Sequence, residues 1–440
     1  MDQKTDVYMN ICMFTNTYIP HIGGVARSVD FLSKDLRRLG HSVLVIAPSF
    51  SEEPEEKDEE KTLRVPAIQN FNGSDFSLRI AVPFMIAKRI KEFQPNVIHS
   101  HHPYLLGDAA LRTARRHALP LVFTHHTLYE KYTHYVPIDS EGMKRFVINL
   151  SREYANLCTH VVAPSRSIAQ LLRDRGVTTP IKEIPTGVDL DFFKQGKKER
   201  FLETNDVTVE EPVIGHVGRL APEKNLGYLA EAVADYLSRN KGSFLVVGGG
   251  PSEREMHQAF QLRGVEKKLL LVGKKSGQEL SDAFNTMELF VFASKTETQG
   301  MVLLEAMAAG KPVIALDAPG AREVVKDGKN GRLLDEDAEK ETFSRAIEEF
   351  FTDPETAVKW SQISLNTAQR HSREAMAKRM LRLYRSVLEE KSLPDTELEK
   401  LVSLEKLMRA LKAEWDLVTQ KASASIKSFT ESDTLKRKAE

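Results

Sequence analysis

Two glutamates, Glu297 and Glu305, lie eight positions apart in the segment SKTETQGMVLLEAMAAGKPVIA, residues 294–315. Glu297 follows the apolar run ELFVFAS, which predicts a position at the carboxyl end of a buried strand. Glu305 lies in the helix-forming run MVLLEAMAAG, which Gly310 ends. The two carboxylates therefore flank the first turn of one predicted helix, where each can accept hydrogen bonds from a ligand.

The turn between these glutamates is predicted to supply hydrogen-bond donors. Gly300 lets a ligand approach the backbone closely. The amides from Gln299 to Val302, that of Met301 included, lie at the positive end of the predicted helix. A phosphate, or a group of hydroxyls that each need an acceptor, fits this combination. The alternative is a solvated loop in which the two acids stand by chance.

Arg219 and Lys224 are cations placed to bind an anion. Both lie in GRLAPEKN, directly after the predicted strand PVIGHV. An arginine offers a forked pair of donors and a lysine a compact charge, so together they suit a diphosphate. A diphosphate that leaves a substrate gains negative charge as its bond breaks, and positioned cations stabilise that change. Ordinary surface charge would explain either residue alone.

A second candidate anion site lies near the N-terminus, at Gly23 and Gly24. These glycines follow the predicted strand YMNICMFT and precede a helix that ends at Gly40, after which comes the strand HSVLVIAP. The first turn of such a strand-helix-strand unit is where α/β sheets bind anions. The spacing differs from the dinucleotide fingerprint GxGxxG, and an ordinary tight turn is the alternative.

Histidines gather at the predicted carboxyl ends of two further strands. His99, His101 and His102 end NVIHSHH, and His125 and His126 follow LVFT. His99 and His101 have the spacing of metal ligands on one strand face, but no carboxylate or cysteine lies nearby in sequence, so we expect no metal. The second stretch continues with one more histidine and three tyrosines and therefore predicts the wall of a site. They are His134, Tyr129, Tyr132 and Tyr135.

Predicted strands and helices alternate along the chain in two successive sets, separated by a polar linker at residues 194–211. This alternation predicts two doubly wound Rossmann-like α/β domains, each with a parallel sheet. We expect the carboxyl ends of both sheets to face each other across a cleft that holds the ligand. The predicted parts are an N-terminal domain at 1–190, a C-terminal domain at 191–371, a helix that packs back toward the N-terminal domain at 372–390, and a helical extension with a disordered tail at 391–440.

Composition limits the class of protein. The 62 Lys and Arg balance 62 Asp and Glu, so bulk charge does not point to nucleic acid as a partner. Cys12 and Cys158 lie in apolar contexts, which favours buried thiols in a reducing compartment over disulfides or a zinc site. No window approaches 18 uninterrupted apolar residues, and MDQKTDVYMN does not read as a signal peptide. We therefore expect a cytoplasmic protein that touches membrane only from outside.

The C-terminal stretch has apolar residues at heptad spacing, which predicts a helix over residues 395–421. This helix either forms a homodimer or packs against the body of the protein. The acidic segment at 52–60 is predicted to be a mobile loop, and the last residues, SASIKSFTESDTLKRKAE, to be disordered. The apolar seam consists of Leu401, Leu404, Met408, Leu411, Trp415 and Val418.

Four segments, taken together, resemble the retaining glycosyltransferases of family 4, which have the GT-B fold. They are GRLAPEKN, VGGGP, ETQGMVLLEAMAAGKPVIA and GAREVVKDGKNGRLL. The spacing of Glu297 and Glu305 is that of the E-x7-E motif of this family, and the similarity extends over about residues 8–390. The resemblance implies a hexosyltransferase that takes its sugar from a nucleotide-diphosphate sugar and uses neither a metal nor a cofactor.

The resemblance also implies roles for the candidate residues. Glu305 would bind the ribose hydroxyls of the nucleotide sugar, and Glu297 the hydroxyls of the transferred sugar. Arg219 and Lys224 would hold the diphosphate, as a divalent metal does in the other major glycosyltransferase fold. His126 matches the histidine that in this family lies near C6 and the anomeric side of the sugar.

In the same way, Gly24 would approach the diphosphate from the N-terminal domain, which would also bind the acceptor. Retention would proceed by attack on the same face of the sugar, with the diphosphate oxygen as the base. The lack of an obvious protein nucleophile in the sequence is consistent with that route.

Two further features resemble the branch of the family that transfers glucose or a related hexose to diacylglycerol at the cytosolic face of a membrane. Gln299 stands where many members carry Phe, and HTLYEKYTHY replaces a more variable loop. This branch implies UDP-glucose as donor and an anionic membrane surface as partner. Residues 1–188 hold about 23 Lys and Arg against about 20 Asp and Glu, and outside the acidic loop the excess of cations is roughly nine.

Basic residues alternate with apolar ones in two predicted N-terminal helices, as expected of helices that lie on an anionic leaflet. The same pattern describes ordinary amphipathic core helices. Two other functions stay open: a transferase that acts on a soluble sugar, a phosphoinositol lipid or a polysaccharide precursor, and a nucleotide-sugar epimerase or binding protein without transfer. The apolar residues concerned are Phe84, Met85, Ile86, Phe146 and Ile148.

Overall fold

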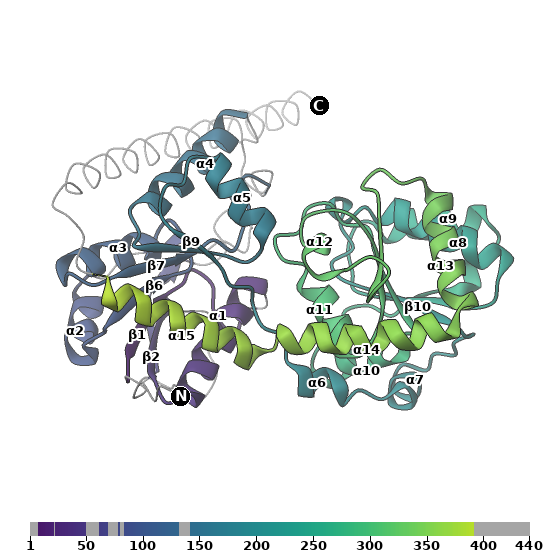
Figure 1. Cartoon of the computed structure of the whole chain (residues 1–440), viewed down its shortest axis with the longest axis horizontal. Coiled ribbons are helices and arrows are strands. Elements are labelled where there is room, and N and C mark those ends of the chain that lie inside the picture. The colour runs from purple at the N-terminus through teal and green to yellow at the C-terminus, as the bar shows by residue number, and fades with distance from the viewer. Residues whose placement is uncertain are drawn as a thin grey trace, which may run out of the picture. The chain divides into compact units, whose positions relative to one another are not determined.

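The computed structural model describes residues 8–21, 23–49, 61–68, 78–79, 83–131 and 141–390, which form two compact units (Figure 1). The described residues up to Ala163, Ala169–Lys182 and those from Leu381 on make up the first unit. The second unit consists of Pro164–Ile168 and Glu183–Met380. The acidic segment at 52–60 and the predicted helix at 395–421 lie outside the described residues.

A parallel sheet forms the centre of the first unit. Its strands are continuous apolar runs, such as Ile11–Phe14, because helices and loops bury both faces of a parallel sheet. The strand order is β3-β2-β1-β6-β7-β8-β9, so the order along the chain reverses between β1 and β6. The strands are β1 (Asn10–Phe14), β2 (Ser42–Pro48), β3 (Thr62–Val65), β6 (Val97–Ser100), β7 (Leu121–Thr124), β8 (His160–Ala163) and β9 (Ile181–Glu183), with a separate antiparallel pair, β4 (Ala67–Ile68) and β5 (Leu78–Arg79).

The helices of the first unit bury one apolar face each. In α1 (Gly24–Arg38), Val29 and Leu36 are fully buried, and the chain leaves the helix through Gly40 at a φ of +90°. Tyr384, on the last helix, is also fully buried here. The remaining helices are α2 (Pro83–Phe93), α3 (Leu106–Arg116), the 3-10 turn η2 (Tyr129–Lys131), α4 (Glu141–Asn156), α5 (Arg166–Asp174) and the end of α15 (Arg373–Glu389).

The second unit has a parallel sheet in the order β12-β11-β10-β13-β14-β15. The order reverses between β10 and β13, which pair directly with each other. Ligands of doubly wound sheets bind outside the carboxyl ends of the strands at such a reversal. The strands are β10 (Val213–Val217), β11 (Ser243–Val247), β12 (Leu269–Leu271), β13 (Leu289–Phe292), β14 (Val313–Leu316) and β15 (Gly331–Leu334).

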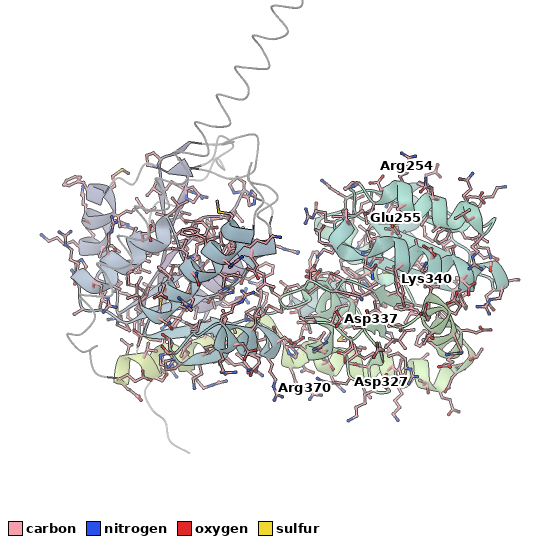
Figure 2. The ribbon with its side chains drawn as sticks, turned by 90° about the horizontal axis from the view of Figure 1, so that it is seen from above. Arg254, Glu255, Asp327, Asp337, Lys340 and Arg370 are labelled. Carbon is pink, nitrogen blue, oxygen red and sulfur yellow. The ribbon has the colours of Figure 1, made fainter. Side chains whose placement is uncertain are left out.

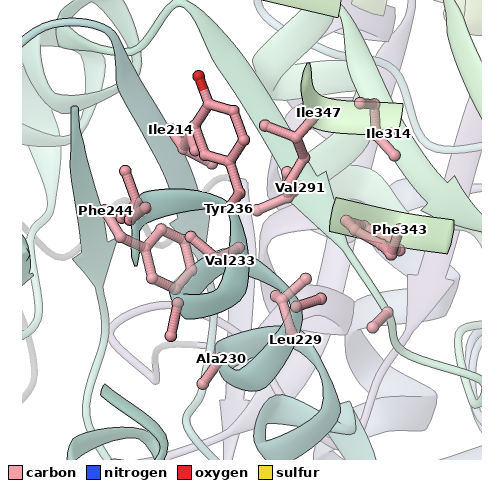
Figure 3. Packing of buried hydrophobic residues seen from close by; sticks show 14 of the residues in the cluster. Ile214, Leu229, Ala230, Val233, Tyr236, Phe244, Val291, Ile314, Phe343 and Ile347 are labelled. Atoms are coloured by element: carbon pink, nitrogen blue, oxygen red, sulfur yellow. The ribbon is translucent and has the colours of Figure 1, made fainter. Parts of the chain in front are cut away.

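Two hydrophobic clusters cover the two faces of this second sheet. Phe244 and Val246 of β11 belong to one cluster, and Leu245 and Val247 to the other, as the alternation of side chains along a strand requires. Figure 3 shows the first cluster, in which Phe244 packs near Val233. Charged residues such as Arg254, Asp327 and Arg370 are exposed (Figure 2).

The helices of the second unit are α6 (Leu190–Lys194), α7 (Lys198–Asn205), α8 (Leu226–Arg239), α9 (Glu253–Leu262), α10 (Gly277–Thr286), α11 (Met301–Ala308), α12 (Ala321–Val324), α13 (Lys340–Thr352), α14 (Pro354–Arg370) and the first half of α15, as far as Met380. The unit also has two 3-10 turns, η4 (Pro222–Lys224) and η5 (Glu266–Lys268). The prediction of two doubly wound α/β units is confirmed. The domain boundaries stay a prediction. Within the described residues, no helix is both long and apolar enough to span a membrane.

Candidate active site

Lys224 and Glu297, more than 70 residues apart in sequence, form a salt bridge in the second unit. Lys224 ends η4, which follows β10, and Glu297 follows β13. The two side chains therefore meet where the strand order reverses. They are 20% and 21% exposed, so a ligand can reach both although neither is fully solvated. Arg219, closer to β10, pairs with Glu223.

Backbone geometry holds the two loops of this salt bridge together. Asn225 adopts a left-handed conformation with a φ of +56° and ends the turn that carries Lys224. Its side-chain amide donates to Ala293 O at 3.4 Å, and the Thr296 hydroxyl donates to Glu223 O at 3.3 Å. The cation and the carboxylate are therefore positioned by two cross-links between the loops as well as by their mutual attraction.

Two glycines allow the backbone to pack closely beside Glu297. Gly300, at a φ of +69°, lies directly before α11, and Gly320, at a φ of +89°, lies directly before α12. A Cβ atom on Gly320 would stand 2.5 Å from the Cβ atom of Glu297, and one on Gly300 would stand 2.9 Å from Gly320 O. Sequence reasoning missed Gly320, although the Pro-Gly pair directly before a short helix is a signal of such a turn.

The first turn of α11 provides the predicted donors. The amides of Met301 and Val302 have no backbone acceptor among the described residues, as expected of the first turn of a helix. Glu305 lies in the next turn and is 7% exposed. One edge of the sheet thus carries backbone amides, a buried carboxylate and the Lys224–Glu297 pair on neighbouring elements. This combination suits a ligand that has both anionic groups and hydroxyls.

Gln299 ties this loop to an earlier part of the chain. Its Oε1 accepts from Thr186 N at 2.8 Å, and its Nε2 donates to Thr186 O, also at 2.8 Å. The side chain is 6% exposed. The side-chain amide of Gln299 therefore makes two hydrogen bonds to the backbone of Thr186, one as acceptor and one as donor. A phenylalanine at this position could make neither.

In the first unit, Gly23 and Gly24 lie between β1 and α1. Gly24 is the first residue of α1, and a Cβ atom on it would have no atom of the described part of the chain within 4 Å. The first turn of α1 carries no acidic residue, so the positive end of this 15-residue helix is not neutralised by a carboxylate of its own first turn. The turn is therefore open at Gly24 and suited to an anion, and that an anion binds there stays a prediction.

His126 follows β7 and contacts His101, which follows β6. His101 Nδ1 lies 2.9 Å from His126 Nε2. Burial lowers the pKa of His126 to about 3, with a further contribution from His125. His126 is therefore neutral at physiological pH and can donate or accept a hydrogen bond, but it does not act as a cation.

The other histidines of the first unit have separate partners. His99 lies between the hydroxyls of Tyr384 and Thr124, at 2.6 and 2.7 Å. His102 Nδ1 accepts from Asn16 N at 3.0 Å and so links the loop after β6 to the loop after β1. Among the described residues, no three His, Cys, Asp or Glu side chains are arranged to hold a metal. His134, Tyr132 and Tyr135 lie outside the described part of the chain.

The candidate residues thus fall into one group in each unit. Gly23, Gly24 and His126 belong to the first unit. Those of the second unit are Arg219, Lys224, Glu297, Gly300, Met301, Val302 and Glu305. In the second unit these residues lie in the segments after β10 and β13, the two strands beside the reversal of strand order, including the start of α11. In the first unit, Gly23 and Gly24 follow β1, which lies beside the reversal, and His126 follows β7, one strand further away. That the two groups bind one ligand together stays a prediction, as do the individual roles.

Comparisons with known proteins agree with this geometry. The chain matches the family model Glycosyltransferase Family 4 over residues 22–192 and the model Glycosyl transferases group 1 over residues 197–366. An alpha-monoglucosyldiacylglycerol synthase of Acholeplasma laidlawii is 30% identical over 351 residues, which cover 75% of this chain and 86% of that protein. A GDP-mannose-dependent alpha-mannosyltransferase of Corynebacterium glutamicum is 29% identical over 398 residues, 86% of this chain and 89% of that protein.

A solved structure, that of Anabaena Alr3699/HepE in complex with UDP, is similar with a TM-score of 0.66 and 19% sequence identity, covering 86% of this chain and 100% of that one. At this identity the likeness shows the fold alone, and it agrees with the predicted GT-B architecture. Because the two family models match successive parts of the chain and the curated relatives are similar over most of their length, the protein belongs to the family 4 glycosyltransferases.

Proposed function

We propose that the protein is a retaining hexosyltransferase that moves glucose from a nucleotide-diphosphate sugar, UDP-glucose, to a 1,2-diacylglycerol lipid. The observation that carries this proposal is the contact of Lys224 with Glu297 at the carboxyl edge of the second sheet. A cation for the leaving diphosphate and a carboxylate for the sugar hydroxyls must stand side by side, because the bond that breaks joins these two parts of the donor.

The remaining residues of the second unit complete the donor site. Arg219 and Lys224 bind the diphosphate, together with the amides of Met301 and Val302 after Gly300. Glu305 accepts hydrogen bonds from the ribose hydroxyls. In the ligand-free protein, Arg219 pairs with Glu223, and the diphosphate replaces that carboxylate on binding. Gly23 and Gly24 contribute an open helix N-terminus from the first unit.

The transfer needs no group beyond these. The bond between the anomeric carbon and the diphosphate oxygen breaks, and its electron pair leaves with the diphosphate. Arg219 and Lys224 stabilise the charge that develops there, which removes the need for a divalent metal. The acceptor hydroxyl attacks the same face of the anomeric carbon and passes its proton to the leaving diphosphate oxygen. Glu297 and His126 orient the sugar meanwhile.

A helix of the first unit supports a lipid acceptor. On α2, Phe84 is 78% exposed and Met85 39% exposed, beside the exposed cations Lys88 and Lys91. Apolar side chains that enter a leaflet, with lysines that meet anionic head groups, are the features of a helix that lies on a membrane surface. We propose that the protein acts in this way as a peripheral protein at the cytosolic face.

The alternative donor is GDP-mannose, which the name of the Corynebacterium glutamicum relative favours. The alternative acceptors are a soluble sugar, a phosphoinositol lipid and a polysaccharide precursor. An epimerase is less well supported, because the described loops beside the first sheet's reversal present histidines rather than paired carboxylates.

The test is to incubate the purified full-length protein with UDP-glucose, UDP-galactose and GDP-mannose, each with and without vesicles that contain diacylglycerol, and to identify glycolipid by mass spectrometry. Transfer from UDP-glucose that requires the vesicles is expected. Transfer to a soluble sugar without vesicles would overturn the lipid acceptor, and the lack of transfer from any of the three donors to any acceptor class would overturn the proposal.

Two substitutions test the site itself. Glu297→Ala and Lys224→Ala should each abolish transfer, while the circular dichroism spectrum and the urea midpoint stay close to wild type, because a partly exposed ion pair contributes only about 0–1 kcal/mol. Lys359→Ala, on an exposed position of α14, is the matched control and should transfer normally. Wild-type turnover by either site variant would mean that the site lies elsewhere.

A further inference from the structure

His101 makes a hydrogen bond to the side chain that we assign to the transferred sugar. Its Nδ1 lies 2.9 Å from His126 Nε2, and the two rings meet edge to edge, with centroids 5.2 Å apart and planes inclined by 25°. The side chain of His101 is 1% exposed. Its second nitrogen, Nε2, is buried and has no hydrogen-bond partner in the described part of the chain. Nδ1 is thus the ring nitrogen of His101 that makes a hydrogen bond, and its partner is His126.

The position of the His101 ring is fixed by its neighbours on the protein side. Its centroid lies 4.1 Å from that of His99. His99 is itself fixed at both nitrogens, by the Tyr384 hydroxyl at 2.6 Å and the Thr124 hydroxyl at 2.7 Å. The backbone amide of His101 donates to Phe14 O at 2.9 Å. His101 therefore presents a rigid Nδ1 to its partner.

Both rings of the His101–His126 pair are neutral. Burial holds the pKa of His101 well below its ordinary value, with contributions from the neighbouring histidines His99, His126 and His102. Burial lowers the pKa of His126 to about 3. A neutral imidazole carries one proton, on either Nδ1 or Nε2, and the hydrogen bond of one nitrogen decides the state of the other.

Two proton arrangements satisfy the hydrogen bond, and they differ in cost. If His126 Nε2–H donates to His101 Nδ1, then the proton of His101 lies on its buried Nε2, which has no acceptor among the residues that the structure describes. If His101 Nδ1–H donates to His126 Nε2, the buried Nε2 of His101 is a bare lone pair. Orphaned buried N–H groups are rarer in proteins than orphaned acceptors, so the second arrangement is favoured.

We propose that His101 is a positioning residue that fixes His126 as the Nδ1–H tautomer, so that His126 donates a hydrogen bond to an oxygen atom of its ligand. His126 Nδ1 is the nitrogen that remains after His101 has taken Nε2. The matching ligand atom is an acceptor: a sugar hydroxyl oxygen or an oxygen of the diphosphate. Only the identity of this ligand rests on the proposed function, because the tautomer follows from the protein alone.

The first measurement is the protonation of the His126 ring in the ligand-free, full-length protein labelled with ¹⁵N at histidine. Long-range proton–nitrogen correlation spectra distinguish the two tautomers, and a His126→Ala variant assigns the signals. A protonated Nδ1 and a bare Nε2 are expected. A protonated Nε2 on His126 would overturn the proposal, whatever the protein's activity.

The second measurement uses a pair of variants of nearly equal size. The amide nitrogen of His101→Asn takes the place of Nδ1 and can still donate, whereas His101→Leu cannot. His101→Leu should give a mixed or Nε2–H tautomer and a kcat lower by roughly tenfold, with the donor KM changed by less than about twofold. His101→Asn should restore the Nδ1–H signal and most of the rate. Equal spectra and equal rates for both variants would overturn the proposal.

A control and a double variant separate this proposal from the proposed function. His117→Asn replaces an exposed histidine of the same unit and should alter neither the His126 signals nor the rate. His101→Leu combined with His126→Ala should be no slower than His126→Ala alone, because His101 acts through His126. If His126 has the Nδ1–H tautomer but His126→Ala transfers hexose at the wild-type rate, the proposed role of His126 fails and the tautomer assignment stands.

Discussion

Gly24 is a residue whose small size the folded protein does not itself require. Its φ lies outside the left-handed region, and a Cβ atom there would meet no atom of the described residues within 4 Å. An alanine at the first position of α1 should therefore fold as well as glycine, or slightly better, because glycine loses more conformational entropy on folding. What the missing side chain leaves open is space for a ligand beside the positive end of a helix.

Gly24→Ala is therefore expected to raise the donor KM by roughly tenfold or more, because a methyl group prevents close approach of the diphosphate, while the free energy of unfolding changes by less than about 1 kcal/mol. Donor titrations and urea unfolding measure the two effects. Gly40→Ala is the control for the donor KM, which it should leave unchanged, although its φ of +90° makes this substitution cost about 1 kcal/mol of stability. An unchanged donor KM in Gly24→Ala would remove this turn from the diphosphate site.

The buried histidines of the first unit predict how stability depends on pH. Burial lowers the pKa of His99 to about 3 and that of His125 to about 4. Both remain neutral in the folded state but take up a proton in the unfolded state below about pH 6.5. Their contribution is thus complete above pH 6.5 and is lost as the pH falls, by up to about 1.4 kcal/mol per pH unit for each histidine.

Urea unfolding between pH 6.5 and pH 5 tests this expectation, in a range where most carboxylates stay ionised. A free energy of unfolding that does not fall over this range would mean that these histidines are protonated in the folded protein.

At the scale of elements, the turn before α12 determines where Glu297 lies. Gly320 has a φ of +89°, and a Cβ atom added to it would lie only 2.5 Å from the Cβ atom of Glu297. Gly320→Ala should lower the free energy of unfolding by about 3 kcal/mol and should also displace Glu297, so that transfer is lost.

Gly328 is the matched control for Gly320. It has a positive φ of +66° but nothing within 4 Å of its Cβ position, so Gly328→Ala should cost only the backbone strain, about 1 kcal/mol, and retain transfer. Urea unfolding and transfer assays compare the two variants. Similar behaviour of both would show that the close approach to Glu297 has no consequence.

The surface of α2 provides a second test at this scale. Phe84→Ser and Met85→Ser should each weaken binding to anionic vesicles by about 5- to 30-fold, because an apolar side chain that enters a leaflet contributes on the order of 1–2 kcal/mol. Val358→Ser, which replaces a residue 73% exposed on α14, is the control and should bind vesicles normally. Vesicle sedimentation measures the affinity, and unchanged binding by both α2 variants would exclude α2 from the membrane contact.

The sequence predicts elements better than it predicts their contacts. The apolar runs of both sheets and the glycine-rich turns are local patterns, and the joint position of Lys224 and Glu297 follows from the rule for parallel sheets. Gly320 beside Glu297 and Tyr384 beside His99 depend on packing between distant segments, for which a single sequence carries no local signal. The His101–His126 bond was likewise not predicted, although both residues were candidates.

At the scale of the whole molecule, the second half of the last described helix, α15, belongs to the fold of the first unit. Tyr384 of α15 is fully buried there and contacts His99 on β6, 285 residues earlier in the chain. Tyr384→Ala should therefore destabilise the first unit by about 3–5 kcal/mol, as the loss of a large buried aromatic side chain does. Tyr384→Phe, which removes the hydroxyl alone, should cost about 1–3 kcal/mol.

Hydrogen–deuterium exchange by mass spectrometry can locate this effect. Faster exchange is expected in peptides of β1 and β6, whereas β10 and β13 should exchange as in the wild type, because they belong to the core of the second unit. An equal change in both sheets would mean that the two units unfold together.

The division of the chain into units has a consequence for its synthesis. The residues from Leu381 on that complete the first unit follow the entire second unit in the sequence. During synthesis, domains generally fold as units, the N-terminal domain first. Here the half that is translated first lacks one of its own helices until nearly 390 residues have been made. During translation the second unit can thus reach its final structure before the first, and a nascent chain that stops early exposes the apolar surface meant for α15.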